Sequence, residues 1–477
     1  MASNHETDVL IVGAGVMGCA LARVLSRYQV RVTVAERADD VAEGASKANS
    51  GIVHAGFDAK PGTDKARLNV LGARMYPALC RELSVPFRNN GALVVAFSEE
   101  DRATLEKLLA QGEKNGVPGL RIVEREELLA MEPNLNPAAV AALLAPTSGI
   151  VSPYELVYAM ADHAALNGAE FLFGREVTGL ERTAEGWLAH TAEGDIACRA
   201  VANCAGIGSA ALHNQVCVEQ VTLIPRRGEY HVLDHPAEPV FTRTIFQCPT
   251  AMGKGVLVTP TVHGNVLLGP TAEDIPDGLD VATTAAGLAD ALGKARLTWP
   301  GVSTRTEITN FSGIRAHEVK GDFVTGETAP GCWEAVGFES PGLTSAPALA
   351  EELGSGIAGA LGLARKETVL PLPEREKPFN EMTDEERAEA VKRNSLHGQL
   401  ICRCEVVTEA EIRAAIRRPV GARSVDGVKR RCRAGMGRCQ GGFCAPRVVE
   451  ILAEELGVPM TEITKGSGNS RMLTGRI

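Results

Sequence analysis

Five of the twelve cysteines lie close together near the end of the chain, at Cys402, Cys404, Cys432, Cys439 and Cys444. The others are scattered singly along the earlier part of the chain, as is typical of small buried apolar side chains. In a reducing compartment, a dense cluster indicates a metal site before it indicates disulfides. Glycines between the last three cysteines let the backbone fold closely around a bound group. We therefore predict a thiolate-ligated metal centre.

Zinc and an iron–sulfur cluster are the two alternatives for this centre. Zinc sites made of four cysteines usually use C-x2-C to C-x4-C pairs, and the pair Cys402-x-Cys404 fits that rule less well. Four thiolates also suit a 2Fe–2S cluster, which the spacing favours. The fifth cysteine leaves open whether Cys432 or Cys439 is a ligand.

A second set of residues with chemical potential is the G-x-G-x-x-G sequence of Gly13, Gly15 and Gly18. An apolar strand at 8–12 precedes it, a helical pattern follows it, and a second strand ends at Glu36. The glycines permit a tight turn, the approach of a pyrophosphate, and close packing of helix on strand. The start of the helix offers unpaired N–H groups to the phosphates. Glu36 can accept hydrogen bonds from the adenosine ribose. The unit predicts a dinucleotide site.

Another G-x-G-x-x-G sequence, at 354–359, lacks this context. No strand precedes it, and the residues on both sides have a helical pattern. We interpret it as a small-residue face or end of a helix. We expect no separate NAD(P)H site.

Composition limits the class of protein. The 477 residues suffice for about two to four domains, and 45% of them are hydrophobic. The formal net charge of -10 argues against a nucleic-acid partner. No apolar run approaches the length of a membrane span, and the first residues have no signal-peptide pattern. We expect a cytoplasmic protein without an integral membrane segment, and peripheral membrane association stays open.

The segment at 44–76 resembles the FAD-dependent D-amino-acid oxidase/glycerol-3-phosphate dehydrogenase superfamily. The resemblance covers about 7–365 and implies FAD as the cofactor. It implies that His54 lies beside the reactive face of the flavin, with an ordinary loop histidine as the alternative. The cofactor contacts that it implies beyond the fingerprint are Ser46, Asn49, Ser50, Gly51, Val177, Gly206, Gly337, Gly342, Leu343 and Thr344.

The same resemblance assigns a substrate anchor to Arg315 in the stretch FSGIRA. A planar and permanently charged fork suits a carboxylate or a phosphate, and an exposed ion-paired arginine is the alternative. A dianionic phosphate would want further cations, for which Arg226, Arg227 and Lys254 are available. We expect a small anionic substrate.

Three stretches, SKANSGIVHAG, VLVTPTVHGN and FSGIRA, most resemble the anaerobic, bacterial glycerol-3-phosphate dehydrogenase branch. The alternatives are an L-2-hydroxyglutarate-like or an amino-acid dehydrogenase. In the glycerol-3-phosphate and L-2-hydroxyglutarate branches, a base takes a hydroxyl proton while a hydride passes to the flavin, and His54 is the expected base.

Residues 397–457 resemble the bacterioferritin-associated-ferredoxin-like domain in their C-x-C and C-x4-C pairs and in RAGMGRCQG. The resemblance implies a 2Fe–2S cluster held by Cys402, Cys404, Cys439 and Cys444. That family usually has threonine at the position of Cys432, which we therefore expect not to bind the cluster.

Together these patterns predict an α/β fold: a Rossmann-type FAD-binding domain, an antiparallel-sheet substrate domain and a small α-rich iron–sulfur domain. Two cofactors in one chain imply electron export to an acceptor flavoprotein or another redox subunit. The alternative is an oxidase with a redox-silent docking or sensing module. The expected ranges are 1–365 for the oxidoreductase (FAD-binding at about 7–80, 150–215 and 325–365, substrate-binding at about 81–149 and 216–324), 366–396 for a linker, 397–457 for the iron–sulfur domain and 458–477 for a tail.

Overall fold

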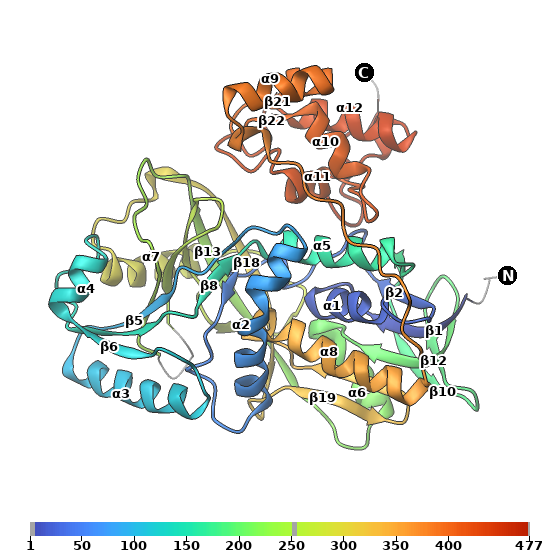
Figure 1. The fold of residues 1–477 in the computed structure, drawn as a ribbon, viewed down its shortest axis with the longest axis horizontal. Coiled ribbons are helices and arrows are strands. Elements are labelled where there is room, and N and C mark those ends of the chain that lie inside the picture. The colour runs from blue at the N-terminus through green and yellow to red at the C-terminus, as the bar shows by residue number, and fades with distance from the viewer. Residues whose placement is uncertain (1–4, 250–254, 476–477) are drawn as a thin grey trace.

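The structure is a computed structural model that describes residues 5–249 and 255–475. Two large sheets and their helices form its larger part, and the segment from α9 onward forms a smaller helical unit, drawn in orange and red in Figure 1. The smaller unit lies beside α5 and α11 faces the larger part. Within the described residues no helix is both long and apolar enough to cross a membrane.

The first sheet has the order β10-β11-β12-β1-β2-β9, with β20 beside β12 and β19 beside β20. β1 runs parallel to β2 and β12, as the predicted strand–helix–strand unit requires. The strands are β1 (His5–Val12), β2 (Val32–Glu36), β9 (Glu170–Phe173), β10 (Gly179–Arg182), β11 (Trp187–His190), β12 (Ile196–Asn203), β19 (Val324–Ala329) and β20 (Cys332–Val336).

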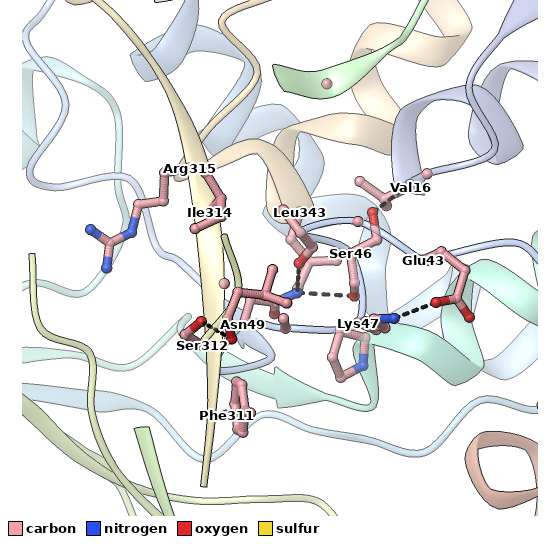
Figure 2. Close-up of a pocket in the computed structure, with 18 of the residues that line it drawn as sticks. Val16, Glu43, Ser46, Lys47, Asn49, Phe311, Ser312, Ile314, Arg315 and Leu343 are labelled. Carbon is pink, nitrogen blue, oxygen red and sulfur yellow. Dashed lines mark hydrogen bonds and ion pairs between the residues drawn. The ribbon is translucent and has the colours of Figure 1, made fainter. Parts of the chain in front are cut away.

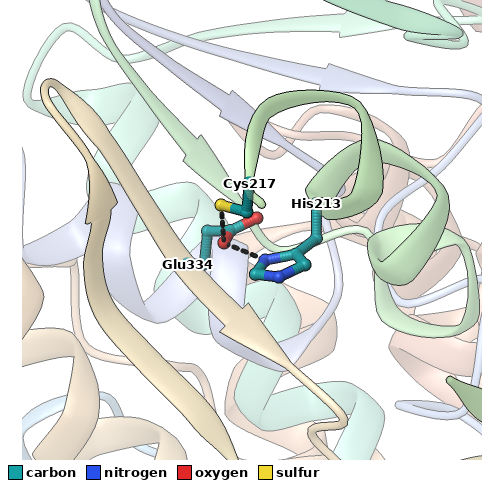
Figure 3. Close-up of side chains that lie close together, drawn as sticks. All are labelled: His213, Cys217 and Glu334. Carbon is teal, nitrogen blue, oxygen red and sulfur yellow. Dashed lines mark hydrogen bonds and ion pairs between the residues drawn. The ribbon is translucent and has the colours of Figure 1, made fainter. Parts of the chain in front are cut away.

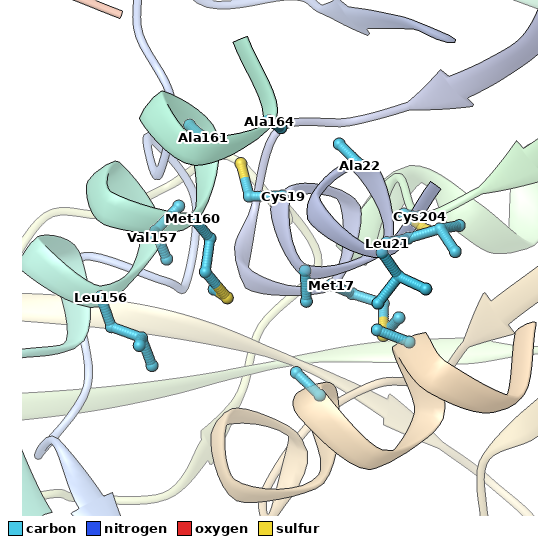
Figure 4. Close-up of a cluster of buried hydrophobic side chains, with 14 of the residues drawn as sticks. Met17, Cys19, Leu21, Ala22, Leu156, Val157, Met160, Ala161, Ala164 and Cys204 are labelled. Atoms are coloured by element: carbon cyan, nitrogen blue, oxygen red, sulfur yellow. The ribbon is translucent and has the colours of Figure 1, made fainter. Parts of the chain in front are cut away.

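Three buried helices pack beside this sheet: α1 (Val16–Leu25), α5 (Pro153–Leu166) and α8 (Gly342–Leu361). Figure 4 shows their apolar side chains, among them Met17, Leu21 and Met160. The G-x-G-x-x-G sequence at 354–359 lies inside α8, and a side chain at Gly354 would fall 2.4 Å from Val24. The interpretation of that sequence as a small-residue helix face is confirmed.

The second sheet has the order β17-β13-β16-β15-β14-β5-β7-β6, and β18 pairs with β13. It is antiparallel as predicted, except that β14 runs parallel to β5. The strands are β5 (Ala92–Ala96), β6 (Arg121–Glu124), β7 (Ala141–Ala145), β13 (Leu223–Leu233), β14 (Thr244–Gln247), β15 (Leu257–Pro260), β16 (Val266–Gly269), β17 (Glu273–Asp274) and β18 (Glu307–Glu318).

A small third sheet and further helices complete the larger part. The sheet has the order β3-β8-β4 and connects the two large sheets along the chain. Its strands are β3 (Ile52–Val53), β4 (Phe87–Arg88) and β8 (Gly149–Val151). The helices are α2 (Asp64–Glu82), α3 (Glu99–Lys114), α4 (Arg125–Met131), α6 (Ser209–Val216) and α7 (Ala285–Thr298).

The carboxy-terminal unit has a separate apolar core, formed by residues such as Val407, Ile412 and Ile451. Capping boxes begin two of its helices, at Thr383 and Thr408, and each hydroxyl accepts a hydrogen bond from the amide three residues later. The elements are α9 (Asp384–Arg393), β21 (Leu400–Cys402), β22 (Val407–Thr408), α10 (Glu409–Ile416), α11 (Val425–Cys432) and α12 (Ala445–Leu456).

The residues expected to form a linker and a tail pack on this unit. The Phe379 ring stacks on His397 with centroids 6.0 Å apart, and the Phe379 amide donates to Glu411 at 3.0 Å. The Asp426 amide donates to the Lys465 carbonyl at 2.7 Å. Residues from about 379 onward therefore belong structurally to the carboxy-terminal unit.

Candidate cofactor sites and active site

The glycine-rich turn between β1 and α1 admits no side chain at its first glycine. Gly13 has φ +98°, and a Cβ atom there would lie 2.7 Å from the Cys204 carbonyl oxygen. A Cβ atom at Gly18 would lie 1.9 Å from the Gly13 oxygen, so helix and strand touch here. At Gly15 an added Cβ atom would meet only the Ser46 hydroxyl, at 3.2 Å. Gly15 therefore faces open space that a ligand can enter.

Glu36, at the end of β2, lies against this turn. Its carboxylate accepts hydrogen bonds from the amides of Ala14, at 2.7 Å, and Ala38, at 2.9 Å. Burial raises the pKa of Glu36, and these two amides act against that rise. The carboxylate lines the same cavity as Gly13 and Gly15, where a ribose could take over part of its hydrogen bonding.

The loop that follows β2 closes over the start of α1. The Val16 amide donates to the Ser46 hydroxyl at 2.8 Å, and the Ala42 amide donates to the Ala14 carbonyl at 2.9 Å. The Asn49 side chain accepts from the Gly51 amide at 2.8 Å and so shapes the turn before β3. These contacts are local and hold the polar loop at the cavity wall.

One cavity of about 1810 Å³ runs from the glycine-rich turn to β18. This volume exceeds the roughly 300–1,000 Å³ of an ordinary small-molecule pocket, so it can hold a dinucleotide and a substrate together. Figure 2 shows Ser46, Asn49 and Leu343 grouped on one side of β18, with Arg315 extending from its other side. The predicted residues that line the cavity are Gly13, Gly15, Glu36, Ser46, Asn49, Ser50, His54, Val177, Gly206, Arg315, Gly342 and Leu343.

Four predicted cofactor residues stand behind this wall: Gly18, Gly51, Gly337 and Thr344 are not among the residues lining the cavity. The fully buried Thr344 hydroxyl accepts a hydrogen bond from the His54 amide at 2.9 Å. Gly51 and Gly337 have positive φ and allow tight turns. These four residues position the residues that line the cavity, and their own contact with the cofactor stays a prediction.

The start of α8 is held against α2. The Tyr76 hydroxyl donates to the Leu343 carbonyl at 2.5 Å, and a Cβ atom at Gly72 would lie 1.9 Å from the Thr344 oxygen. This close approach fixes Gly342 and Leu343 at the cavity, where the helix amino terminus presents amides and a partial positive charge.

Arg315 and Arg226 are directly opposite each other in the β13–β18 pair, and both line the cavity. Arg315 Nη2 donates to the Thr271 carbonyl at 3.1 Å, which leaves other guanidinium N–H groups for a ligand. Arg226 is ion-paired with Asp274 at 2.6 Å. Neighbouring cations of this kind suit an anionic group.

The other two candidate cations behave differently. Arg227 is buried on the opposite face of β13, does not line the cavity, and pairs with Glu273 at 2.7 Å and Asp280 at 3.1 Å. It therefore has no place in the site. Lys254 lies outside the described residues.

Sequence reasoning missed two residues on β13 that face the cavity side. A Cβ atom at Gly228 would lie 2.5 Å from Arg315 Nη2, so glycine makes room for the guanidinium. Burial raises the pKa of Tyr230, while Arg315 and Ser50 at its hydroxyl act in the opposite direction. The signal was the alternation along the strand, because residues 226, 228 and 230 share one face.

The four predicted cluster ligands lie in two close pairs within the carboxy-terminal unit, Cys404 with Cys439 and Cys402 with Cys444. The sulfurs of Cys404 and Cys439 are 3.7 Å apart. The Phe443 amide is the main cause that lowers the pKa of Cys439, and the amides of Gly441 and Gly442 act in the same sense. Backbone N–H groups directed at a sulfur stabilise a thiolate, as a bound metal centre requires.

The second half of the set has the same construction. The Cys444 thiol is the main cause that lowers the pKa of Cys402 to about 6, and the amides of Gly435 and Glu405 contribute. The two sulfurs are close enough to form a hydrogen bond, and two thiolates there would attract a cation. Thiol pairs with convergent amides fit a thiolate-ligated cluster.

Cys432 makes its hydrogen bond within its own helix. It ends α11, and its thiol donates to the Val428 carbonyl at 3.3 Å within the helix. Burial raises its pKa to about 12, so it remains a neutral thiol at ordinary pH. This geometry supports the expectation that Cys432 is a bystander.

The cysteine loop also borders the large cavity. Met436, shortly before Cys439, and Gln440, directly after it, are among the residues lining this cavity. The Tyr154 hydroxyl contacts Met436 Sδ at 3.7 Å. Glu155 joins this junction through contacts with Arg375 and His263. Burial tends to raise its pKa, but these two neighbours hold it well below the ordinary value.

A third group of side chains, His213, Cys217 and Glu334, also lies close together (Figure 3). Glu334 is fully buried, forms a hydrogen bond with His213 Nδ1 at 2.5 Å and accepts one from Asn203 at 2.8 Å. His213 Nε2 donates to the Glu219 carbonyl at 2.9 Å. With both ring nitrogens engaged, the group ties α6 to the first sheet and has no free imidazole ligand.

Two family models match the chain. The model described as FAD dependent oxidoreductase matches residues 8–355, and the model described as BFD-like [2Fe-2S] binding domain matches residues 400–454. Gly13, Gly15 and Glu36 fall within the first match, and all four converging cysteines fall within the second.

Individual proteins of both kinds resemble the chain. It is 46% identical over 471 residues to "Glycerol 3-phosphate dehydrogenase" of Caloramator mitchellensis, covering 98% of each chain. It is 32% identical to "Glycerol 3-phosphate oxidase" of Mycoplasma pneumoniae, covering 72% of this chain and 93% of that one. A solved structure, the dithionite-reduced L-alpha-glycerophosphate oxidase from Mycoplasma pneumoniae with FAD bound, superposes with a TM-score of 0.73 at 30% identity over 77% of this chain and 99% of that chain.

Proposed function

The chain belongs to the FAD-dependent oxidoreductase family and carries a 2Fe–2S domain, and from this premise we propose that it oxidises glycerol 3-phosphate to dihydroxyacetone phosphate and exports the electrons to a redox partner. The observation that carries the proposal is the single cavity lined by the dinucleotide turn, by Arg315 and Arg226, and by the cysteine loop. The 46% identity to a glycerol 3-phosphate dehydrogenase over nearly the whole chain supports the choice of substrate.

The reaction removes a hydride from the carbon and a proton from the hydroxyl of a secondary alcohol. FAD supplies the hydride acceptor when bound, and a 2Fe–2S cluster supplies a one-electron carrier. In our proposal an imidazole nitrogen of His54 takes the hydroxyl proton. Its position supports this role, because its amide is held by Thr344 and its carbonyl by Asn69 at 2.5 Å, while the residue lines the cavity.

The phosphate of the substrate would bind Arg315, with Arg226 providing a second positive charge from the neighbouring strand. Gly228 leaves space for the Arg315 guanidinium, and Tyr230 adds a hydroxyl near it. A fixed planar fork and a second cation suit a dianionic group better than a single lysine would.

Cys402, Cys404, Cys439 and Cys444 would hold the cluster. Their place beside the cavity favours internal electron transfer, because the loop that carries Met436 and Gln440 is part of the cavity wall. The acceptor would then be a flavoprotein or another redox subunit that docks at the exposed side of Cys404. All twelve cysteines are free of disulfides, which agrees with the cytoplasmic location that we propose.

The test is anaerobic reduction of the purified holoenzyme, and the readout is the loss of flavin absorbance. Glycerol 3-phosphate should bleach the flavin and then generate the paramagnetic signal of a reduced cluster. Reduction by L-2-hydroxyglutarate or an amino acid, without reduction by glycerol 3-phosphate, would reject the substrate assignment.

A second arm tests electron export. With an artificial acceptor, turnover should exceed turnover with oxygen alone, and peroxide should form slowly under air. Rapid peroxide formation combined with a cluster that stays oxidised would instead support an oxidase with a redox-silent module.

A further inference from the structure

Helix α11 of the iron–sulfur unit is docked on the loop that covers the dinucleotide turn. The Arg431 guanidinium binds both oxygens of the Asp40 carboxylate, at 2.6 and 2.7 Å, and both side chains are buried. Arg430 forms an ion pair with Glu43 and donates to the Tyr158 hydroxyl at 2.6 Å. A buried and bidentate pair of this kind defines one orientation of the helix.

This loop is the one that leads from Glu36 to Ser46. Ala42 within it is hydrogen-bonded to Ala14 of the glycine-rich turn. Arg430 and Arg431 therefore lie against the loop at the nucleotide half of the cofactor site, whereas Arg433, at the end of α11, donates to Asn265, directly before β16 of the second sheet, at 3.2 Å.

The face of α11 toward the cavity follows helical spacing. Asp426, Lys429, Arg430 and Arg433 line the cavity at intervals of three and four residues. Three of the four side chains are cationic. Arg430 is satisfied by Glu43, Arg433 is paired with Glu405 at 2.7 Å, and Asp426 is paired with Lys465 at 2.8 Å.

Lys429 differs from the other three residues. Within residues 5–249 and 255–475, its ammonium group makes no hydrogen bond or ion pair. The side chain is only partly exposed, and burial lowers its pKa. Asp426, whose charge acts against that lowering, is already paired with Lys465. A half-buried ammonium group without a hydrogen-bond partner is unfavourable, and a bound anion beside it would reduce that penalty.

We propose that Lys429 of the iron–sulfur unit binds the anionic diphosphate–ribose part of FAD, so that α11 completes the cofactor site of the neighbouring domain. The resemblance to FAD enzymes accounts for residues of the larger part alone, and no motif in either part assigns a cofactor contact to this helix. The chemistry required is one ammonium group near the bound phosphates, with α11 held in place by Asp40.

The experiment measures the rate of FAD release from full-length holoenzyme after dilution. The readout is the rise in flavin fluorescence. Lys429→Gln should accelerate release roughly 10- to 100-fold, the loss expected for one charge-assisted hydrogen bond. Lys429→Arg should stay within about threefold of the natural protein, because it keeps the charge. Added salt should accelerate release from the natural protein more than from Lys429→Gln.

The matched control is Lys392→Gln on α9, which removes an equal charge from the same unit at a side chain that is 71% exposed. It should release FAD at the natural rate. Iron content should be unchanged in all three variants, which shows that the unit is folded.

Equal release from Lys429→Gln and Lys392→Gln would overturn the proposal. A fast Lys429→Arg variant with full iron content would also overturn it. Neither result would bear on the substrate, because flavin reduction by glycerol 3-phosphate is measured separately.

Discussion

The two cofactor sites of this chain are built in opposite ways. The FAD cavity collects residues from β1, the loop after β2, the start of α8 and the β13–β18 pair, and two of them, Gly13 and Leu343, are 330 positions apart in the sequence. The cysteine site lies within residues 402–444, and its sulfurs face amides from the same short segment. The first site depends on how whole elements of two large sheets pack, and the second depends on two short segments of one small unit, with α10 and α11 between them.

This difference separates two kinds of damage. A substitution in the cavity removes one contact from a site that the fold has already formed. A substitution at one of the four predicted cluster cysteines would remove a ligand, and we expect no neighbouring residue to replace it. The predictions below use this contrast, from the largest expected effect to the smallest.

Gly15→Val should abolish FAD binding while leaving the protein folded. An added Cβ atom meets only the Ser46 hydroxyl at 3.2 Å, so the side chain occupies the space that the pyrophosphate needs. Flavin absorbance should disappear, and iron content should stay at two per chain because the cysteine site is local. Gly359→Val is the control, since nothing lies within 4 Å of a Cβ atom there and its motif is helical. Loss of iron together with FAD would contradict this separation of the sites.

Cys439→Ser should remove the cluster signal and stop electron export, while substrate should still bleach the flavin. The reason is that four thiolates are needed and Cys432 points to a helix carbonyl. Cys432→Ser should keep the cluster. Iron and zinc analysis and paramagnetic resonance check both variants. Retention of the cluster in Cys439→Ser with loss in Cys432→Ser would reverse the ligand assignment. Stoichiometric zinc in the natural protein would show that the site holds zinc and not a 2Fe–2S cluster.

Arg315→Ala should lower kcat/KM for glycerol 3-phosphate by roughly 10- to 150-fold, because a charge-assisted anchor contributes about 1.5–3 kcal/mol. Arg315→Lys should recover part of that loss, since it restores charge without the planar fork. FAD content should be unaffected in both. An Arg315→Ala enzyme with ordinary kinetics would refute the anchor.

The smallest expected effect is a pH dependence at His163 of α5, the helix that touches both regions. Burial lowers the pKa of His163 to about 4, from an ordinary value of 6.5. Between these two values the unfolded chain binds a proton that the folded chain rejects, so the free energy of unfolding falls as the pH drops from 6.5 toward 4. His163→Gln should reduce the dependence of the free energy of unfolding on pH by the equivalent of up to one bound proton, as measured by chemical denaturation at several pH values. An identical slope would show that other groups cause it.

Local patterns predicted the local structure well. The unit of Gly13, Gly15 and Glu36, the capping residues Thr383 and Thr408, and the helical context of 354–359 could all be recognised because each depends on neighbours in the chain. The predicted ligand set converges for the same reason, although the ligation itself stays a prediction.

Contacts between distant elements were not predictable in this way. Arg226 and Arg227 look equivalent in the sequence. Because side chains alternate between the two faces of a strand, Arg226 lines the cavity whereas Arg227 lies on the other face and pairs with Glu273. Thr344 matches a cofactor motif, yet it binds the His54 amide behind the wall. The docking of α11 has no sequence signal, because basic residues on a short helix are usually solvated.

The buried contacts of helix α11 hold the two parts of the molecule together independently of the peptide segment that connects them. The extended segment at 370–378 is mostly exposed, whereas Arg431 and Asp40 on either side of the domain junction are buried. A protease that cuts this segment should therefore give a nicked protein whose two fragments elute together from a sizing column in native buffer. The peptide connection would be needed to bring the two parts together during folding, and after that it would be dispensable.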